Sequence, residues 1–185
     1  MRNGKGIAMK ARWAWPVVLA LLGVAVHGGP AGATAATTPG FKGTTLASAT
    51  FGEIKSHMES EVSKPHWQEE IRTHGLSDLY VQQNTWDPTV CNGCIPSTGW
   101  HTHPGPSLVI VTLGSVTAYD GDDPKCTAHV YTANTPNNSF VDPGDGHVHI
   151  LRDESGAPAQ TIAVQLIPSG AQRRQDVSAP GNCPF

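Results

Sequence analysis

The part of the chain after residue 79 consists of short β-forming runs separated by glycine- and proline-rich turns. No helix-length amphipathic segment interrupts these runs, which cover residues 79–83, 108–113, 115–119, 129–132, 139–141, 148–151 and 161–167. Glycine supplies 20 and proline 15 of the 185 residues, a proportion typical of short strands joined by many turns. The pattern predicts an all-β sandwich or small barrel and disfavours folds that alternate strands with helices.

The sequence divides into four segments. Residues 1–36 form a leader, residues 37–78 an irregular lead-in with an edge strand, residues 79–168 the barrel, and residues 169–185 a C-terminal tail. In the lead-in we expect a mobile stretch over 37–50, a strand near 50–54 and one short helical turn after it. Within the barrel, residues 108–113 and 115–119 are predicted to form a hairpin around Gly114.

The leader has the pattern of a secretory signal peptide. A basic segment over 1–12 precedes an apolar one over 13–26, and small residues follow, with cleavage expected after Ala33, Ala35 or Ala36. The alternative is an uncleaved anchor. However, fourteen apolar residues at ~1.5 Å each span roughly 21 Å, short of a ~30 Å hydrocarbon core. The sequence therefore predicts a secreted protein without membrane contact after cleavage.

The distribution of charged residues along the chain disfavours some classes of binding partner. The formal net charge is -3, but the first 36 residues hold four cations and no acids, which leaves 8 cations against 15 acids in the rest. An acidic remainder without a basic stripe argues against nucleic acid or an anionic membrane as a partner. We expect a small molecule as the partner, with a homodimer as a further expectation.

Export permits disulfides between the four cysteines, which are Cys91, Cys94, Cys126 and Cys183. Three pairings exist and sequence alone does not select one. Cys91 and Cys94 could also form a redox dithiol or half of a zinc site, but loop-forming residues surround them and no second CxxC occurs. We favour structural bridges between Cys91 and Cys94 and between Cys126 and Cys183. The second would close a 58-residue loop.

Histidines are the strongest candidates for a functional site. They form two pairs, His101-Thr-His103 and His147-Val-His149. On a strand, side chains two residues apart share a face with Cβ atoms roughly 6.6 Å apart, so two imidazoles can reach one metal ion. The second pair follows 46 residues after the first. We therefore predict that the pairs lie on distant strands that face each other across the barrel.

Both pairs lie in segments that resemble the motifs of the cupin superfamily. Residues 99–114 resemble the first motif, in which His-x-His is followed by an acid and then by a glycine, at Gly114 here. Residues 143–153 resemble the second motif, with His149 in the ligand position and a proline-to-glycine spacing one residue longer than usual. The whole stretch from 51 to 185 is similar to small exported bacterial cupins. The resemblance implies a single jelly-roll β-barrel.

The resemblance also implies the ligand set His101, His103 and His149. The acid of the first motif would fall at Ser107 or Leu108, so a fourth, carboxylate ligand is not implied. Three neutral imidazoles suit Fe, Zn, Ni or Cu better than Mg or Ca. Ser107 and His147 are candidate neighbours of the metal. For His147, a further ligand or a proton shuttle is the alternative.

Other candidate residues have structural interpretations. We expect Trp100 to pack in the core and His129 to be structural or to lie at the barrel mouth. Arg152 could hold an anionic substrate, but pairing with Asp153 or Glu154 is the favoured interpretation. No phosphate-binding or dinucleotide-binding loop occurs.

These observations support two main functional hypotheses. The first is a metal-dependent enzyme, an oxygenase, isomerase or lyase, that acts on a small molecule. The second is a non-catalytic extracellular module that binds a small ligand or a metal. A third is a metal-free structural barrel. Fold alone does not separate them, because one scaffold supports many chemistries.

Overall fold

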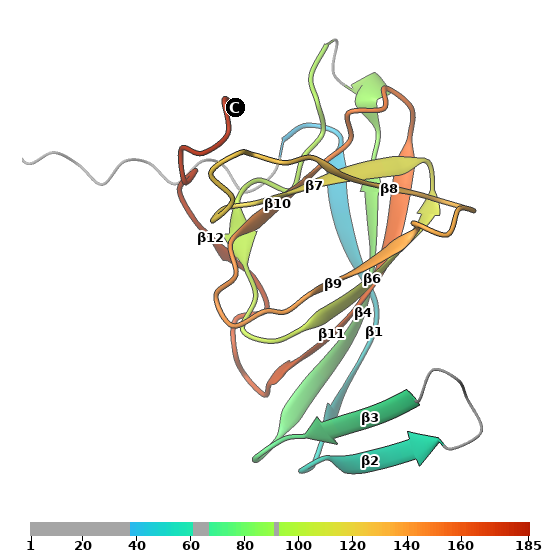
Figure 1. Ribbon diagram of the computed structural model, residues 1–185, viewed down its shortest axis with the longest axis vertical. Helices are drawn as coiled ribbons and strands as arrows, with labels where there is room; N and C mark the ends of the chain where they lie inside the picture. Colours follow the sequence, from blue (N-terminus) through green and yellow to red (C-terminus); the bar gives the residue numbers. More distant parts are fainter. Residues whose placement is uncertain (1–37, 61–66, 91–92) are drawn as a thin grey trace, which may run out of the picture.

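The computed structural model describes residues 38–60, 67–90 and 93–185. The predicted leader and Cys91 therefore lie outside the described residues. The described part is almost entirely β-structure (Figure 1), and its only helical element is a 3-10 turn, Pro88–Val90. The strands are β1 (Phe41–Phe51), β2 (Lys55–Ser60), β3 (Trp67–Arg72), β4 (Ser77–Trp86), β5 (His101–Thr102), β6 (Ser107–Leu113), β7 (Ser115–Asp120), β8 (His129–Thr132), β9 (Ser139–Asp142), β10 (His149–Arg152), β11 (Ala159–Pro168) and β12 (Gln175–Asp176).

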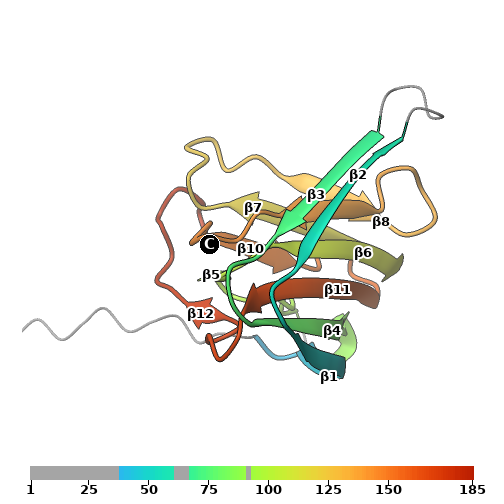
Figure 2. The same cartoon turned by 90° about the horizontal axis from the view of Figure 1, so that it is seen from below.

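Two five-stranded antiparallel sheets form the body of the molecule. The first has the order β1-β4-β11-β6-β9 and the second β12-β5-β10-β7-β8. The sheets lie as two layers in Figure 2, and the separate hairpin of β2 and β3 crosses the same view in front of them. Non-sequential neighbours within each sheet give the jelly-roll arrangement. The prediction of an all-β jelly-roll barrel is confirmed.

The core lies between the sheets. One cluster joins residues from both of them, namely Trp86, Val111, Val116, Ala118, Leu151 and Ala159. On β11 buried and partly buried residues alternate along the whole strand, because one face of the strand points into the barrel. The sequence does not show this alternation, because the inward residues of β11 include the polar Thr161 and Gln165.

The chain changes sheet at Gly114, and the predicted hairpin around this residue is wrong. β6 pairs with β11 and β9, whereas β7 pairs with β10 and β8. Gly114 has a φ of +64°, and a Cβ there would lie 2.5 Å from the carbonyl oxygen of Pro158. One glycine thus makes a corner between layers where the sequence suggested a turn between paired strands.

The lead-in also differs from expectation. The stretch 37–50 was predicted to be mobile, but β1 runs over Phe41–Phe51 and pairs with β4 along its length. Its side chains are mostly exposed, and its sequence lacks the apolar β-forming run that indicated the other strands. After it, β2 and β3 form an antiparallel hairpin in place of the expected helical turn.

The C-terminal tail is fastened to the barrel. A disulfide joins Cys126 to Cys183, as favoured from the sequence. The ring of Phe185 stacks on Trp100 at 6.4 Å and meets Tyr119 edge-on at 5.0 Å, while the Arg152 guanidinium lies 3.6 Å from its centroid. Trp100 is therefore a core residue, as predicted.

The fourth cysteine also forms a disulfide. Cys94 is disulfide-bonded, and its expected partner lies outside the described residues.

Among the described residues, no helix has the length and hydrophobicity needed to cross a bilayer.

Candidate metal centre

Three histidines from the second sheet converge between the two layers. His101 begins β5, His103 follows the end of that strand, and His149 begins β10. His149 is the direct antiparallel partner of His101. The histidines therefore come from neighbouring strands, and the prediction that they face each other across the barrel is wrong. A two-residue strand is too short to give a sequence signal, which explains the error.

The three rings are close enough to share one ion. One nitrogen from each of His101, His103 and His149 lies within 4.8 Å of the others. The ring centroids are 4.3 Å apart for His101 and His149, 4.8 Å for His101 and His103, and 5.3 Å for His103 and His149. Nitrogens that bind one zinc ion tetrahedrally at ~2.0–2.1 Å are roughly 3.3 Å apart, so modest ring movements close the set.

Burial keeps these imidazoles neutral. All three side chains are buried, and burial is the main cause that lowers the pKa of His101 well below its usual value of 6.5. Burial also lowers the pKa of His103. The pKa of His149 falls to about 4, mainly through burial, although nearby Asp142 opposes the change. Neutral imidazole is the form that binds metal, so the lowered pKa values are compatible with metal binding at neutral pH.

Hydrogen bonds select which ring nitrogen is available. The Nδ1 atoms of His101 and His103 donate to the carbonyl oxygens of Gly99 and Arg173, each at 2.8 Å. The Nδ1 of His149 points to the carbonyl of His147 at 3.4 Å. Since a carbonyl only accepts, each Nδ1 carries the proton and Nε2 keeps its lone pair. Such contacts commonly orient metal-binding histidines.

A carboxylate that the sequence analysis missed lies behind His149. Asp142 is buried at the end of β9, with Oδ1 3.7 Å from Nδ1 of His149 and 3.2 Å from Nδ1 of His147. Its Oδ2 is buried and has no hydrogen-bond partner among the described residues. The only sequence signal was its place before the Pro143–Gly146 turn. A carboxylate in this position would make the imidazole a stronger ligand for a metal ion.

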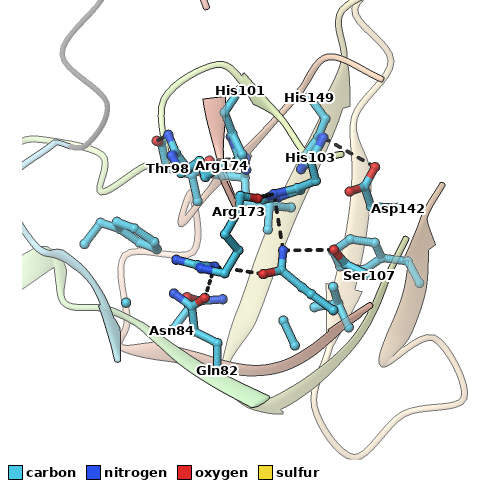
Figure 3. A pocket seen from close by; sticks show the side chains of 17 residues that line it. Gln82, Asn84, Thr98, His101, His103, Ser107, Asp142, His149, Arg173 and Arg174 are labelled. Carbon is cyan, nitrogen blue, oxygen red and sulfur yellow. Dashed lines mark hydrogen bonds and ion pairs between the residues drawn. The ribbon is translucent and has the colours of Figure 1, made fainter. Parts of the chain in front are cut away.

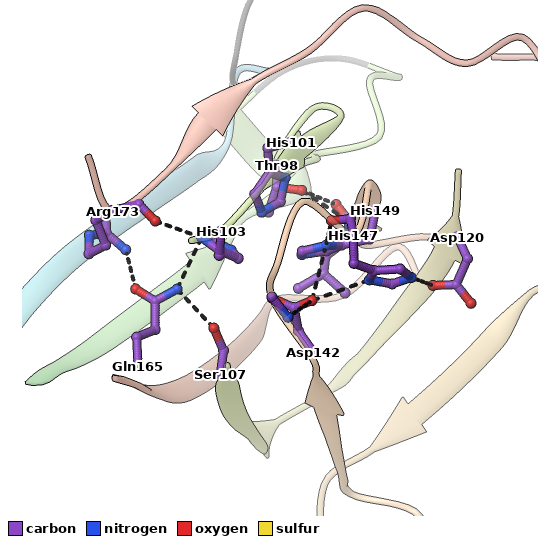
Figure 4. Close-up of polar contacts among 12 residues, drawn as sticks. Thr98, His101, His103, Ser107, Asp120, Asp142, His147, His149, Gln165 and Arg173 are labelled. Atoms are coloured by element: carbon purple, nitrogen blue, oxygen red, sulfur yellow. Dashed lines mark hydrogen bonds and ion pairs between the residues drawn. The ribbon is translucent and has the colours of Figure 1, made fainter. Parts of the chain in front are cut away.

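His147 is separate from the three-histidine cluster (Figure 4). β10 begins only at His149, so His147 belongs to the preceding turn and does not follow strand alternation. Its ring lies between two carboxylates, with Nδ1 on Asp142 and Nε2 3.4 Å from Oδ1 of Asp120. Asp142, His147 and His149 form a second group whose ligand atoms lie within 4.8 Å. This group shares His149 with the first.

A row of polar side chains on the first sheet faces the histidines. Gln165 on β11 pairs across strands with Ser107 on β6, and Ser107 pairs with Asp142 on β9. Ser107 is 1% exposed and Leu108 58%, so of the two positions expected for the motif acid only Ser107 faces inward. The amide of Gln165 donates to Ser107 Oγ at 3.0 Å and lies 3.2 Å from Nδ1 of His103.

The sheets enclose a cavity of about 230 Å³ at the histidines (Figure 3). Arg173 and Arg174 from the tail enter it, and neither was predicted because the tail carries no motif. Arg173 donates through Nη1 to the amide oxygens of Gln82 and, at 2.8 Å, of Gln165. Arg174 pairs with Asp176. The cavity thus combines neutral imidazoles with cationic groups.

The other candidates lie outside this cavity. Arg152 bonds Glu154 at 2.8 Å, in agreement with the favoured interpretation. His129 is exposed and lies 3.9 Å from Asp120, beside a second hollow that is also lined by His147. His129 is therefore an exposed residue on β8, and its structural role or its place at the barrel mouth stays a prediction.

Comparisons give structural neighbours only. No protein-family model and no curated protein sequence matches the chain. Similar solved structures include a cupin superfamily protein from Desulfitobacterium hafniense DCB-2, at 11% identity and a TM-score of 0.38 over 49% of this chain and 68% of that one. A cupin-like protein from Thermotoga maritima MSB8 matches at 18% identity and 0.41, over 55% and 65%.

A third neighbour is the polyketide cyclase RemF from Streptomyces resistomycificus, at 16% identity and a TM-score of 0.41 over 55% of this chain and 64% of that one. This chain therefore spans about two thirds of the length of these structures. Two of these neighbours are described as cupin superfamily or cupin-like proteins. The strand order of this chain itself defines a jelly-roll barrel, and its histidine cluster forms a site that could hold a metal.

Proposed function

We propose that this protein binds one divalent transition metal through Nε2 of His101, His103 and His149 and acts on a small molecule at that metal. The observation that carries the proposal is the convergence of three buried, neutral imidazoles whose Nδ1 atoms are already committed to other groups. Nitrogen ligands favour Zn, Fe, Ni or Cu over Mg or Ca. The metal's identity is open among these four.

The arrangement suits catalysis because three protein ligands leave a metal with an open position. The ligands line the cavity, so a small molecule in it would lie beside that position. When bound, the metal would supply Lewis acidity or redox chemistry there. The chain itself orients the ligands, through the Gly99 and Arg173 carbonyls and through Asp142, and shields the site between two sheets. An oxygenase, isomerase or lyase is the class of enzyme that we propose.

One observation favours the alternative, a non-catalytic binding module. Asp142 is the only carboxylate among the described residues that line the cavity, and it already contacts His147. The described lining thus offers no carboxylate that is free to act as a general base. A module that only captures a ligand or a metal needs no such group.

Elemental analysis of the chain purified without an affinity tag tests metal binding. We expect about one metal per chain, lost in His101→Ala and His149→Ala. The metal should be kept in His147→Ala and in His57→Ala, whose residue is exposed on β2 and serves as the matched control. Metal that survives His101→Ala and His149→Ala, or no metal in the parent chain, contradicts the proposal.

Turnover separates the enzyme from the binding module. The metal-loaded chain would be screened for oxygen uptake with thiols, phenols and flavonoids, and for isomerised or cleaved products by mass spectrometry. Turnover that disappears in His149→Ala supports the enzyme. Stoichiometric binding of a compound without conversion supports the module.

Secretion and a homodimer are further parts of the proposal. The Cys126–Cys183 bridge suits an oxidising compartment.

The proposed homodimer would use the outer face of the first sheet. The exposed apolar residues on this face, which a second copy could cover, are Leu108, Ile110 and Val141. Light scattering after gel filtration measures the oligomeric state, and a monomer at all concentrations contradicts the dimer.

A further inference from the structure

We infer that the cavity selects small carboxylates and that Arg173 recognises the carboxylate group. This inference rests on the proposed function because it names the class of molecule that would lie at the histidine centre. It concerns a residue of the C-terminal tail, which the motifs of the barrel do not include.

The backbone of Arg173 is anchored to the histidine centre. Its carbonyl oxygen accepts the hydrogen bond from Nδ1 of His103 at 2.8 Å. The tail is held on one side by the pairing of β12 with β5 and further along by the Cys126–Cys183 bridge. The start of the Arg173 side chain is therefore fixed beside a predicted ligand, and Figure 3 shows this side chain reaching into the cavity.

The guanidinium is only partly satisfied by the protein. Among the described residues, its hydrogen bonds run from Nη1 to the amide oxygens of Gln82 and Gln165, and none runs from Nε or Nη2. The buried side-chain atoms that lack a hydrogen-bond partner do not include Nε or Nη2 of Arg173. Both atoms are therefore accessible from the cavity or from solvent. Arginine has five N–H donors in a planar fork, so at least one edge of this fork is free to bind a ligand.

The positive charge of the Arg173 guanidinium also lacks a carboxylate partner among the described residues. Its two partners are neutral amides, and no carboxylate among the described residues forms an ion pair with it. Arg174 differs because its guanidinium lies 2.6 Å from Asp176. A half-buried cation without a counter-ion attracts an anion from solution, and a carboxylate matches the guanidinium fork with two parallel hydrogen bonds.

The size and walls of the cavity limit the rest of the ligand. A volume of about 230 Å³ is below the ~300–1,000 Å³ typical of sites for drug-sized ligands. Besides the polar groups, the lining includes the apolar side chains Phe41, Val109, Phe140 and Leu151. The ligand class that fits is a small monocarboxylate with a short apolar body.

NMR titration of the zinc-loaded chain with butyrate and butyramide tests this inference, because the two probes share a shape and differ in charge. Charge-assisted hydrogen bonds of this kind correspond to roughly 10- to 100-fold in affinity. We expect butyrate to bind at least about 10-fold more tightly than butyramide. Equal affinity for the two probes, or tighter binding of inorganic phosphate than of butyrate, overturns the carboxylate assignment.

Two substitutions identify the residue that is responsible. Arg173→Gln should keep its zinc and lose the preference for butyrate, whereas Arg173→Lys should keep its zinc and part of the preference. Arg72→Gln removes a positive charge from the β2–β3 hairpin, away from the cavity, and should behave like the parent chain. An unchanged preference in Arg173→Gln overturns the inference, as does loss of zinc from both Arg173 variants, since Arg173 would then be a structural support.

The metal-free chain separates this inference from the proposed function. If the parent chain binds no zinc, the proposed function fails. A butyrate preference that depends on Arg173 would then still appear in the metal-free titration if the inference is correct. If the chain binds zinc normally but the metal-free chain shows no preference for butyrate, the inference that Arg173 recognises the carboxylate directly is overturned.

Discussion

His149 lies directly opposite His101 in the antiparallel pairing of β10 with β5, and their ring centroids are 4.3 Å apart. The pairing brings together two residues that are 48 positions apart in the sequence. It also places the rings on the same side of the second sheet, opposite the polar row of the first. The geometry of the candidate centre is thus a consequence of strand register, and changes that disturb the register should disturb the site.

Asp142 is predicted to strengthen metal binding without being a ligand. Its Oδ1 lies 3.7 Å from Nδ1 of His149, so Asp142→Asn removes the negative charge behind that imidazole. We expect metal affinity to fall roughly 10- to 100-fold, as is typical when such partners are lost. Competition with a chelator measures the change. Asp145→Asn in the adjoining turn is the exposed control, and equal affinities in the two variants would refute the role of Asp142.

The disulfide between Cys126 and Cys183 should be a major source of stability. It closes a long loop, with a sequence separation of 57 residues, for which the chain-entropy model gives about 4 kcal/mol. We expect the Cys126→Ala, Cys183→Ala double variant to unfold at much lower denaturant concentration while retaining its β-sheet circular dichroism. A midpoint equal to that of the parent chain would show that the bridge does not stabilise the fold.

Acid should destabilise the metal-free protein. Burial holds the pKa of His149 at about 4, whereas an unfolded histidine titrates near 6.5. Between these two values the unfolded chain binds protons that the folded chain does not, so the free energy of unfolding decreases as pH falls through this window. His101 and His103, whose pKa values are also lowered, act in the same direction.

The expected slope is on the order of 1 kcal/mol per pH unit for each fully affected histidine. Urea denaturation of the chelator-treated protein at pH 7.5, 6.0 and 5.0 measures it. His149→Gln should show a shallower decline than the parent chain. A parent chain that is equally stable at all three pH values would contradict the neutral, buried state of the histidines.

Gly114→Ala tests the corner between the sheets. Gly114 and Gly146 both have positive φ, but only at Gly114 does an added Cβ meet backbone, at 2.5 Å from the Pro158 carbonyl oxygen. Both alanine variants bear a conformational cost of roughly 1–2 kcal/mol, and the clash should add about 1–3 kcal/mol at Gly114 alone. Thermal unfolding compares them. Similar melting temperatures would mean that the corner tolerates a side chain.

Much of the barrel could be predicted because its strands are short β-forming runs bounded by glycine- and proline-rich turns. The apolar runs of β6 and β11 are visible in the sequence, and so are the two His-x-His pairs. Which face of these strands points inward is not visible, because polar Ser107 and Gln165 are buried while Leu108 is exposed. β1 could not be predicted in this way, since an exposed edge strand is held by main-chain hydrogen bonds that leave no hydrophobic pattern. The corner at Gly114 was missed because a glycine between two β runs is equally typical of a hairpin.

The candidate site was only half predictable for a related reason. His101, His103 and His149 occur in motifs, but the residues around them come from separate strands and from the tail. Cross-strand pairing aligns Asp142 and Gln165 with Ser107 on the first sheet, and the packing of the two sheets brings them to the histidines. Arg173 reaches the site only because the tail folds back over the barrel. Single residues brought together by tertiary structure carry no local sequence signal.

The most direct test of the account is a crystal structure of the zinc-loaded chain with anomalous diffraction data at the zinc edge. The account predicts a single strong peak between the sheets, about 2.0–2.1 Å from Nε2 of His101, His103 and His149. It also predicts that Nδ1 of His103 remains on the Arg173 carbonyl. A peak that is bound instead by Asp142 and His147, or no peak between the sheets, would contradict the three-histidine centre.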